Sequence, residues 1–270
     1  MNRNADPPGF SRDTIGIIGA GHLGLGLAGA LLDHGFPQAD LLVSHAGSPG
    51  TRANIRDAGL ENNLAENPEI CRWASVIFIA VRPQSVAALA KLPFPDNGLV
   101  VSCMAGISRE SLGKHLGIEV IRMMQSGPDT IRQNRGIAAI CPDHPKLSGL
   151  LSFMGLDVHA MPDEESMHVF TAGVCLPAAI LAYRATGRDP DEAISGIGRE
   201  FPLLLDMHRW AGEVTPACDS RAEEEAYIAR MCTPGGVTSA IVTSIRAGTS
   251  FSAAIHAGIL RSREISGSYG

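Results

Sequence analysis

Residues 14–24 read Thr-Ile-Gly-Ile-Ile-Gly-Ala-Gly-His-Leu-Gly, and this stretch decides the fold of the first half of the chain. A short apolar run is followed by glycines spaced G-x-G-x-x-G, namely Gly19, Gly21 and Gly24. The pattern predicts a buried strand, a tight turn and a helix that begins at the turn. The first glycine permits the bend, the second lets a pyrophosphate approach, and the third lets helix and strand pack closely. We therefore expect a dinucleotide site; the alternative is a glycine-rich turn without a ligand.

Similar apolar runs, rich in Val and Ile, recur through the first half and alternate with helical patterns. The expected strands are 14–21, 39–45, 75–83, 99–106, 119–126 and 136–142, with helices at 22–35 and 51–59. Strands that alternate with helices indicate βαβ units and a parallel sheet with right-handed crossovers. The fold class expected from this half is α/β, a doubly wound parallel sheet of the Rossmann type.

The second half changes character, because no strand pattern follows residue 163 or so. Apolar residues recur at helical spacing in five segments, which are 165–187, 191–212, 219–232, 233–248 and 249–266. We expect a disordered tail at 1–13, a dinucleotide-binding domain at 14–160 and an all-helical domain at 161–270.

The composition excludes several classes of protein. Of 270 residues, 22 are Lys or Arg and 28 are Asp or Glu, so the net charge is −6, unlike the basic footprint of a nucleic-acid binder. No apolar run approaches the roughly 20 residues that span a membrane. The six cysteines show neither C-x-x-C nor metal-ligand spacing, and the polar N-terminus lacks a signal-peptide pattern. We expect a cytoplasmic protein with free thiols and no metal.

The end of the second expected strand bears on the choice of cofactor. It reads Val43-Ser44-His45 and has no carboxylate before Asp57, whereas Arg52 lies close by. An acid at this point usually holds the ribose hydroxyls of NAD, and an Arg accommodates the 2′-phosphate of NADP. Ser44, His45 and Arg52 therefore favour NADPH over NADH. The alternative for Arg52 is a solvated helix residue.

A second motif, Thr233-Pro234-Gly235-Gly236-Val237-Thr238, separates two helical patterns. Thr is a good N-cap and Pro suits the first helical position, so we expect a helix that starts at Thr233, with both glycines in its first turn. Free N–H groups there, together with the Thr233 and Thr238 hydroxyls, would form a carboxylate site. The alternative is an ordinary capped corner between helices.

Several motifs occur together in one order and resemble the pyrroline-5-carboxylate reductase family over about residues 14–265. They are GAGHLG (19–24), AVRPQ (80–84), AGIS (105–108), CTPGGVT (232–238) and the RSRE ending (261–264). The resemblance implies a Rossmann domain, a helical domain that dimerises, and NAD(P)H-dependent reduction of a cyclic imine that carries a carboxylate. The implied reaction is the reduction of pyrroline-5-carboxylate, or a close cyclic imino acid, to proline or its analogue.

The resemblance also implies roles for particular residues. Thr233, Gly235, Gly236 and Val237 would hold the substrate carboxylate, and Thr238 would hydrogen-bond the ring nitrogen or relay a proton. The residues expected at the cofactor are Gly19, Gly21, His22, Leu23, Gly24, Ser44, His45, Arg52, Asn67, Ala80, Val81, Arg82, Pro83, Ala105 and Gly106.

The chain departs from the family pattern in two segments. The family's Met-Pro-Asn-Thr-Pro appears as Met-Gln-Ser-Gly-Pro at 124–128, and its Ser-Gly-Ser-Gly-Pro-Ala-Tyr as Gly-Val-Cys-Leu-Pro-Ala-Ala at 173–179. His22 stands where Asn is common. A reductase for another imine or ketimine in secondary metabolism, or a catalytically silent NADP-binding dimer, therefore remains an alternative. The apolar stretches at 174–183 and 201–207 favour a homodimer or higher homo-oligomer.

Overall fold

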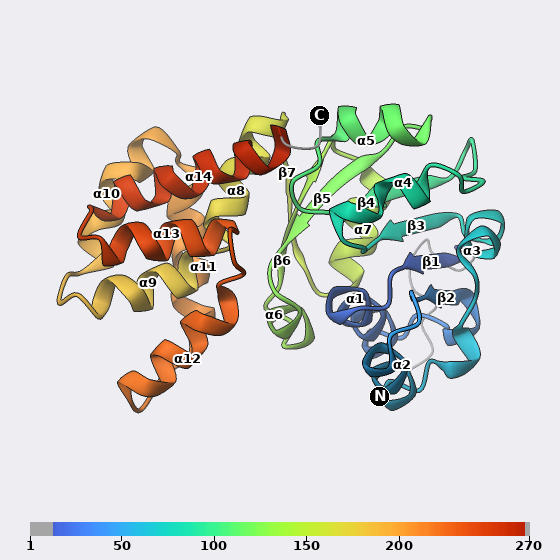
Figure 1. Ribbon diagram of the computed structural model, residues 1–270, viewed down its shortest axis with the longest axis horizontal. Coiled ribbons are helices and arrows are strands. Elements are labelled where there is room, and N and C mark those ends of the chain that lie inside the picture. The colour runs from blue at the N-terminus through green and yellow to red at the C-terminus, as the bar shows by residue number, and fades with distance from the viewer. Residues whose placement is uncertain (1–12, 268–270) are drawn as a thin grey trace. The chain divides into compact units, whose positions relative to one another are not determined.

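The computed structural model describes residues 13–267 (Figure 1). The chain divides into two compact units, Met1–Pro162 and Asp163–Gly270, whereas the sequence placed the boundary after residue 160. The disordered tail expected at 1–13 lies, apart from residue 13, outside the described residues.

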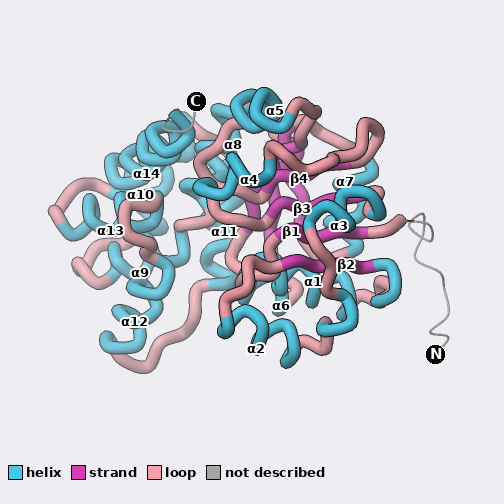
Figure 2. The backbone as a smooth tube through the Cα atoms, turned by 45° about the vertical axis from the view of Figure 1, so that its right-hand side comes forward, coloured by secondary structure: helices cyan, strands magenta, loops and turns pink. Residues whose placement is uncertain are grey.

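A single seven-stranded sheet forms the centre of the first unit, drawn in magenta in Figure 2. Its order is β2-β1-β3-β4-β5-β6-β7, and every neighbouring pair is parallel except β5 and β6. The strands are β1 Ile15–Ile18, β2 Leu41–Ser44, β3 Val76–Ile79, β4 Leu99–Ser102, β5 Ile121–Gln125, β6 Ile137–Cys141 and β7 Asp157–Ala160. The expected α/β class is confirmed.

Two features of the sheet differ from the expectation. The pair β5–β6 is antiparallel, because its connection holds only the short helix α6 (Pro128–Arg132) and a parallel crossover needs a dozen or more residues. Strand β7 was not expected at all. It lies at the edge of the sheet and none of its side chains is fully buried, so it lacks the apolar run of a central strand.

The helices of the first unit connect these strands. They are α1 His22–Asp33, α2 Pro49–Asp57, α3 Asn67–Trp73, α4 Val86–Leu89, α5 Arg109–Leu116, α6 and α7 Pro145–Phe153, with short 3-10 turns at Gln38–Asp40, Glu61–Asn63 and Pro83–Ser85. The core joins α1 to the strands: Ile17, Phe78, Leu27 and Leu31 have no exposed surface. The strand ends that surround the glycine turn are therefore held by a well-packed interior.

The second unit is helical throughout its described part, residues 163–267, as expected. Its helices are α8 Glu164–Gly173, α9 Leu176–Arg184, α10 Pro190–Glu200, α11 Leu203–Val214, α12 Arg221–Met231, α13 Val237–Arg246 and α14 Phe251–Gly267. Every residue of α9 from Leu176 to Tyr183 is buried within the chain. That apolar stretch therefore needs no partner to cover it. Within residues 163–267, the large apolar side chains that are exposed are Leu205 and Leu260.

Within residues 13–267, no helix by itself has the length and apolar composition to cross a membrane. The bent pair α8 and α9 passes that test only when the two helices are counted together.

Candidate functional site

The three glycines of the first motif occupy positions that side chains would disrupt. Gly19 has φ +105°, a conformation that glycine adopts readily, and a Cβ on Gly24 would lie 2.1 Å from the Gly19 carbonyl oxygen. A Cβ on Gly21 would meet nothing within 4 Å. Gly21 is also the N-cap of α1, so the open space lies beside N–H groups that have no partner in the helix. This arrangement can accept a phosphate group.

The sheet order places this turn at a topological switch point. Strand β1 lies between β2 and β3, with Ile18 paired to Ser44 on one side and to Ile79 on the other. The carboxyl ends of these three parallel strands therefore meet at one edge of the sheet (Figures 1 and 2). In open α/β sheets, ligands bind in the crevice outside such an edge.

The residues expected at the cofactor ribose differ in burial and in their contacts. Ser44 is only 5% exposed, and its carbonyl accepts hydrogen bonds from the N–H groups of Gly19 (3.2 Å) and Ala20 (2.6 Å). Ser44 thus lies beneath the glycine turn and fixes its shape. His45 is half-buried, and its Nδ1 accepts a hydrogen bond from the Gly47 N–H at 2.9 Å.

Arg52 borders a hollow of about 280 Å³ just beyond β2. The other lining residues are Gly47, Pro49, Ala53 and Arg56. Arg56 also pairs with Glu61 at 3.0 Å, and the side chain of Ser48 caps α2 by accepting a hydrogen bond from the Thr51 N–H. Arg52 lies near the start of α2, whereas Arg56 lies in its last turn. A guanidinium group at this place can hold a phosphate.

Four further residues expected at the cofactor follow β3. The Ala80 N–H donates to the Ile18 carbonyl at 2.8 Å, so Ala80 and Val81 stand directly beside the glycine turn. A Cβ on Gly19 would approach Val81 Cγ1 to 2.7 Å. Arg82 is exposed, and Pro83 opens a 3-10 turn.

The remaining expected cofactor residues are spread along neighbouring loops. Ala105 is exposed and Gly106 has φ +77° in the loop that leads from β4 to α5. Asn67 is the half-buried first residue of α3. His22 and Leu23 open α1, and His22 Nε2 lies 4.0 Å from an Asp129 carboxylate oxygen of α6.

The second motif is a turn, and the expected helix start at Thr233 is wrong. Helix α13 begins at Val237, and its N-cap is Gly236. The Gly236 N–H donates to the Thr233 carbonyl at 2.9 Å, and Gly235 has φ +71°. Pro followed by a glycine of positive φ matches a type II turn, a conformation that competes with the helical one. The N–H groups of the first turn of α13 are therefore those of Val237, Thr238 and Ser239.

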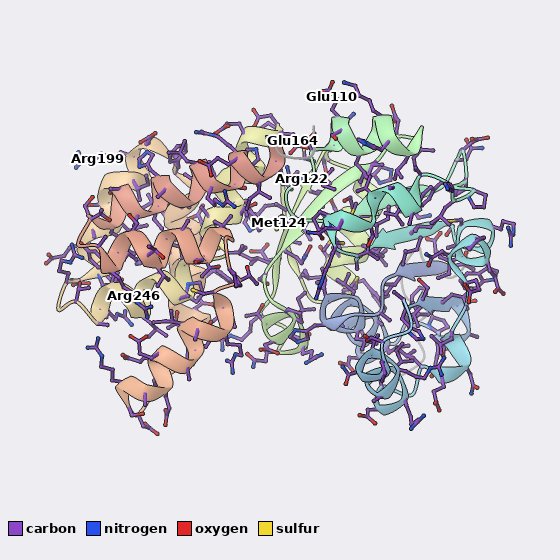
Figure 3. The ribbon with its side chains drawn as sticks, in the orientation of Figure 1. Glu110, Arg122, Met124, Glu164, Arg199 and Arg246 are labelled. Atoms are coloured by element: carbon purple, nitrogen blue, oxygen red, sulfur yellow. The ribbon has the colours of Figure 1, made fainter. Side chains whose placement is uncertain are left out.

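Both ends of α13 are tied to other helices. At its start, Arg261 Nε of α14 donates to the Gly235 carbonyl at 2.7 Å. At its end, Arg246, which is labelled in Figure 3, pairs with Glu225 of α12. Arg261 is the first residue of the RSRE ending, and its role was not evident from the sequence. Its position shows that this ending holds the glycine turn in place.

The rest of that ending anchors α14 to α8. His168 Nδ1 lies 2.9 Å from Ser262 Oγ, and Arg263 donates hydrogen bonds from its Nε and Nη2 to the Glu165 carboxylate. The Arg263 hydrogen bond holds the pKa of the Glu165 carboxyl below its ordinary value.

Thr238 lies one residue into α13, half-buried, and its hydroxyl contacts Cys175. Thr238 Oγ1 donates to Cys175 Sγ at 3.1 Å. Burial raises the pKa of the Cys175 thiol to about 11. In the sequence, Cys175 stands out only as a departure from the family pattern, because 63 residues separate it from Thr238.

Three other residues of the two departing segments, Ser126, Leu176 and Ala179, are buried as well. Ser126 is 2% exposed, and its Oγ accepts hydrogen bonds from Thr130 Oγ1 (2.7 Å) and from the Ile137 N–H (3.1 Å). Leu176 and Ala179 have no exposed surface and pack inside the helical unit.

All six cysteines are free thiols. Among residues 13–267, no three His, Cys, Asp or Glu side chains are grouped to hold a metal ion.

Comparison with known proteins agrees with this geometry. A family model described as NADP oxidoreductase, coenzyme F420-dependent, matches residues 14–106, the segment that carries the glycine turn. The chain is 27% identical to pyrroline-5-carboxylate reductase 2 of Macaca fascicularis, over 93% of this chain and 83% of that protein. It is also 27% identical to pyrroline-5-carboxylate reductase of Pisum sativum, over 94% and 96% of the two chains.

The chain is similar to pyrroline-5-carboxylate reductases over nearly its whole length.

Solved structures of such reductases share the fold of this chain. The pyrroline carboxylate reductase of Plasmodium falciparum, a crystal structure with NADP bound, covers 96% of this chain and all of its own, with a TM-score of 0.60 and 17% identity. The reductase from Coxiella burnetii gives a TM-score of 0.59 at 16% identity and covers 94% of this chain.

Proposed function

We propose that this protein is an NADPH-dependent reductase of cyclic imines that carry a carboxylate, with pyrroline-5-carboxylate as the first candidate substrate. One observation carries the proposal: the same chain holds a phosphate-accepting glycine turn at the sheet's switch point and a Thr-Pro-Gly-Gly turn that opens α13 beside Thr238. The similarity to proteins named pyrroline-5-carboxylate reductase supports this substrate class.

The residues at the switch point fit a dinucleotide. Gly21 leaves open space at the start of α1 for the pyrophosphate, and Val81 and Ala105 would line the path toward the nicotinamide. Arg52 would face the 2′-phosphate at the hollow beyond β2. Bound there, NADPH would supply the hydride for the reduction.

The residues of the second motif fit a carboxylate. Val237, Thr238 and Ser239 offer N–H groups at the positive end of α13, and Thr233 adds a hydroxyl. A side chain at Gly236 would lie 2.4 Å from Thr233 Oγ1, so glycine keeps this hydroxyl in place. A carboxylate held here would orient the imine by its neighbouring ring atoms.

A second candidate is a reductase of the same fold that acts on a different imine. The buried Leu176 and Ala179 favour it, because they stand where the family pattern has a glycine and a Tyr. Ala179 lacks the polar hydroxyl of the family's Tyr, and Leu176, which follows Cys175 in the chain, adds a large apolar side chain in place of the family's glycine. A less polar ring would then bind better than pyrroline-5-carboxylate.

The proposed assembly is a homodimer. Leu205 of α11 and Leu260 of α14 are large apolar side chains that are exposed on the helical unit. In an isologous dimer the same surface of both subunits forms the contact, so these two side chains would be buried in each subunit. Analytical ultracentrifugation of the wild type and of Leu260→Glu tests this. A wild-type protein that sediments as a monomer would contradict the dimer.

The test of the function is NADPH oxidation with pyrroline-5-carboxylate, with NADH run in parallel. Turnover that is faster with NADPH supports the proposal and the role of Arg52. Binding of NADPH without turnover on this substrate, but with turnover on a larger or less polar cyclic imine, would favour the second candidate. Binding without turnover on any imine would indicate a catalytically silent protein.

A further inference from the structure

A chain of hydrogen bonds leads from Thr238 into the helical unit. Thr238 Oγ1 donates to Cys175 Sγ at 3.1 Å, and Cys175 Sγ donates to the Thr171 carbonyl at 3.3 Å. Thr171 is in the last turn of α8, Cys175 lies between α8 and α9, and Thr238 is in the first turn of α13. These two hydrogen bonds therefore link the start of α13, which carries the expected catalytic residue Thr238, to the end of α8.

The direction of these bonds follows from their chemistry. A carbonyl oxygen only accepts hydrogen bonds, and a thiol has a single proton. The Val174 and Cys175 N–H groups donate to the carbonyls of Phe170 and Ala172, and the thiol donates to the carbonyl between them.

The protonation of Cys175 agrees with that direction. Burial raises the pKa of the Cys175 thiol to about 11, so the group keeps its proton at neutral pH. With that proton directed to Thr171, the sulfur meets Thr238 as an acceptor.

The hydroxyl of Thr238 has one proton and two lone pairs. Because the proton points inward to Cys175, only lone pairs face the half-exposed side of α13. We propose that Cys175 is a positioning residue that holds the Thr238 proton inward, so that Thr238 accepts a hydrogen bond from the N–H of a protonated cyclic imine. This inference rests on the proposed function and specifies the protonation state of its substrate.

The reduction is balanced without a proton from the protein. The substrate enters as an iminium ion, whose nitrogen already bears a proton. Hydride forms a new C–H bond at the imine carbon, and the π pair of the C=N bond moves to nitrogen and neutralises its charge. The N–H that Thr238 accepts persists throughout, and the product amine takes its second proton from water.

Ligand selectivity tests the inference without turnover. Two ring carboxylates differ in the group that would face Thr238: proline presents N–H donors, whereas tetrahydrofuran-2-carboxylate presents an oxygen that only accepts. Calorimetric titration in the presence of NADP+ should show the wild type binding proline at least about five times more tightly, the size of one hydrogen bond. In Cys175→Ala the Thr238 hydroxyl is free to turn and donate, so this ratio should fall several-fold. Cys175→Ser should keep it, because a hydroxyl both donates and accepts.

Controls separate positioning from folding. If Cys175→Ala only disturbed the local structure, it would weaken the binding of both ligands alike and leave the ratio of their affinities unchanged. Cys218→Ala, which removes a thiol far along the chain, should match the wild type. A wild-type ratio in Cys175→Ala, or a Cys175→Ser variant that behaves like Cys175→Ala, would overturn the inference.

Failure of the proposed function would give a different result. If the wild type bound neither ring and reduced no imine, the function would be wrong. The infrared S–H stretch would then still test the hydrogen bond. The S–H band of Cys175 is assigned by its loss in Cys175→Ala. We expect this band to shift in Thr238→Val, and an unshifted band would refute the hydrogen bond between Thr238 and Cys175.

Discussion

Replacing Gly24 by alanine should destabilise the protein, because the cost of overpacking against the glycine turn should exceed the gain in helix propensity of α1. The new Cβ would lie 2.1 Å from the Gly19 carbonyl oxygen and 3.0 Å from its carbon, whereas ordinary contact begins at 3.4 Å. The obstacle is backbone and cannot rotate away, so the glycine turn must shift. Overpacking of this kind costs about 1–3 kcal/mol.

Gly29 is the matched control, because it lies in the same helix and an added Cβ would meet nothing within 4 Å. Gly29→Ala should stabilise the protein by about 0.5–1 kcal/mol. Both variants gain the same helix propensity, so the difference in their unfolding free energies isolates the overpacking cost.

The assay is urea unfolding followed by circular dichroism, together with NADPH titration by fluorescence. We expect Gly24→Ala to be less stable than Gly29→Ala by about 1–3 kcal/mol and to bind NADPH more weakly. Equal stability of the two variants would refute the packing argument. Unchanged NADPH affinity in a destabilised Gly24→Ala would refute the role of the turn in binding.

Three other predictions concern the Thr-Pro-Gly-Gly turn, the choice of cofactor and the pH dependence of stability. Gly235→Ala should lose roughly 1–2 kcal/mol of unfolding free energy, because φ +71° is costly for alanine, and should raise KM for a carboxylate substrate. Arg52→Ala should weaken NADPH binding roughly tenfold and leave NADH binding unchanged, since only NADPH carries the 2′-phosphate. Glu165→Gln should cost about 0.2–1 kcal/mol at neutral pH, because the pair with Arg263 is half-exposed. The folded pKa of Glu165 is lowered from 4.5, so this difference should hold above pH 4.5 and vanish as the pH falls through the lowered value.

Each of these predictions has a control. Gly212→Ala lies in α11 with open space around it and should not raise KM. Arg199→Ala, on α10 (Figure 3), should leave both cofactor affinities unchanged. High salt should shrink the Glu165→Gln difference at neutral pH. A Gly235→Ala variant as stable as the wild type, equal losses of NADPH and NADH binding in Arg52→Ala, or a Glu165→Gln difference that grows in acid would each contradict the structural reasoning.

The sequence by itself determined the fold class and the position of the glycine turn. Buried parallel strands need continuous apolar runs, and the G-x-G-x-x-G spacing reports a local backbone requirement, so both appear directly in the order of residues. Edge strand β7 was not predicted, because its side chains are not fully buried and it therefore lacks a continuous apolar run. The helix start at Thr233 was misread because Thr and Pro suit both a helix N-terminus and a type II turn.

Only the tertiary structure decided which distant residues support the second motif. Cys175 meets Thr238 across 63 residues, and Arg261 reaches Gly235 across 26. Such contacts depend on how α8, α9, α13 and α14 pack, and helical periodicity shows which face of each helix is apolar without showing which helix it will meet. The direction of the Thr238 proton, and with it the proposed protonation state of the substrate, therefore follows from packing that the order of residues does not reveal.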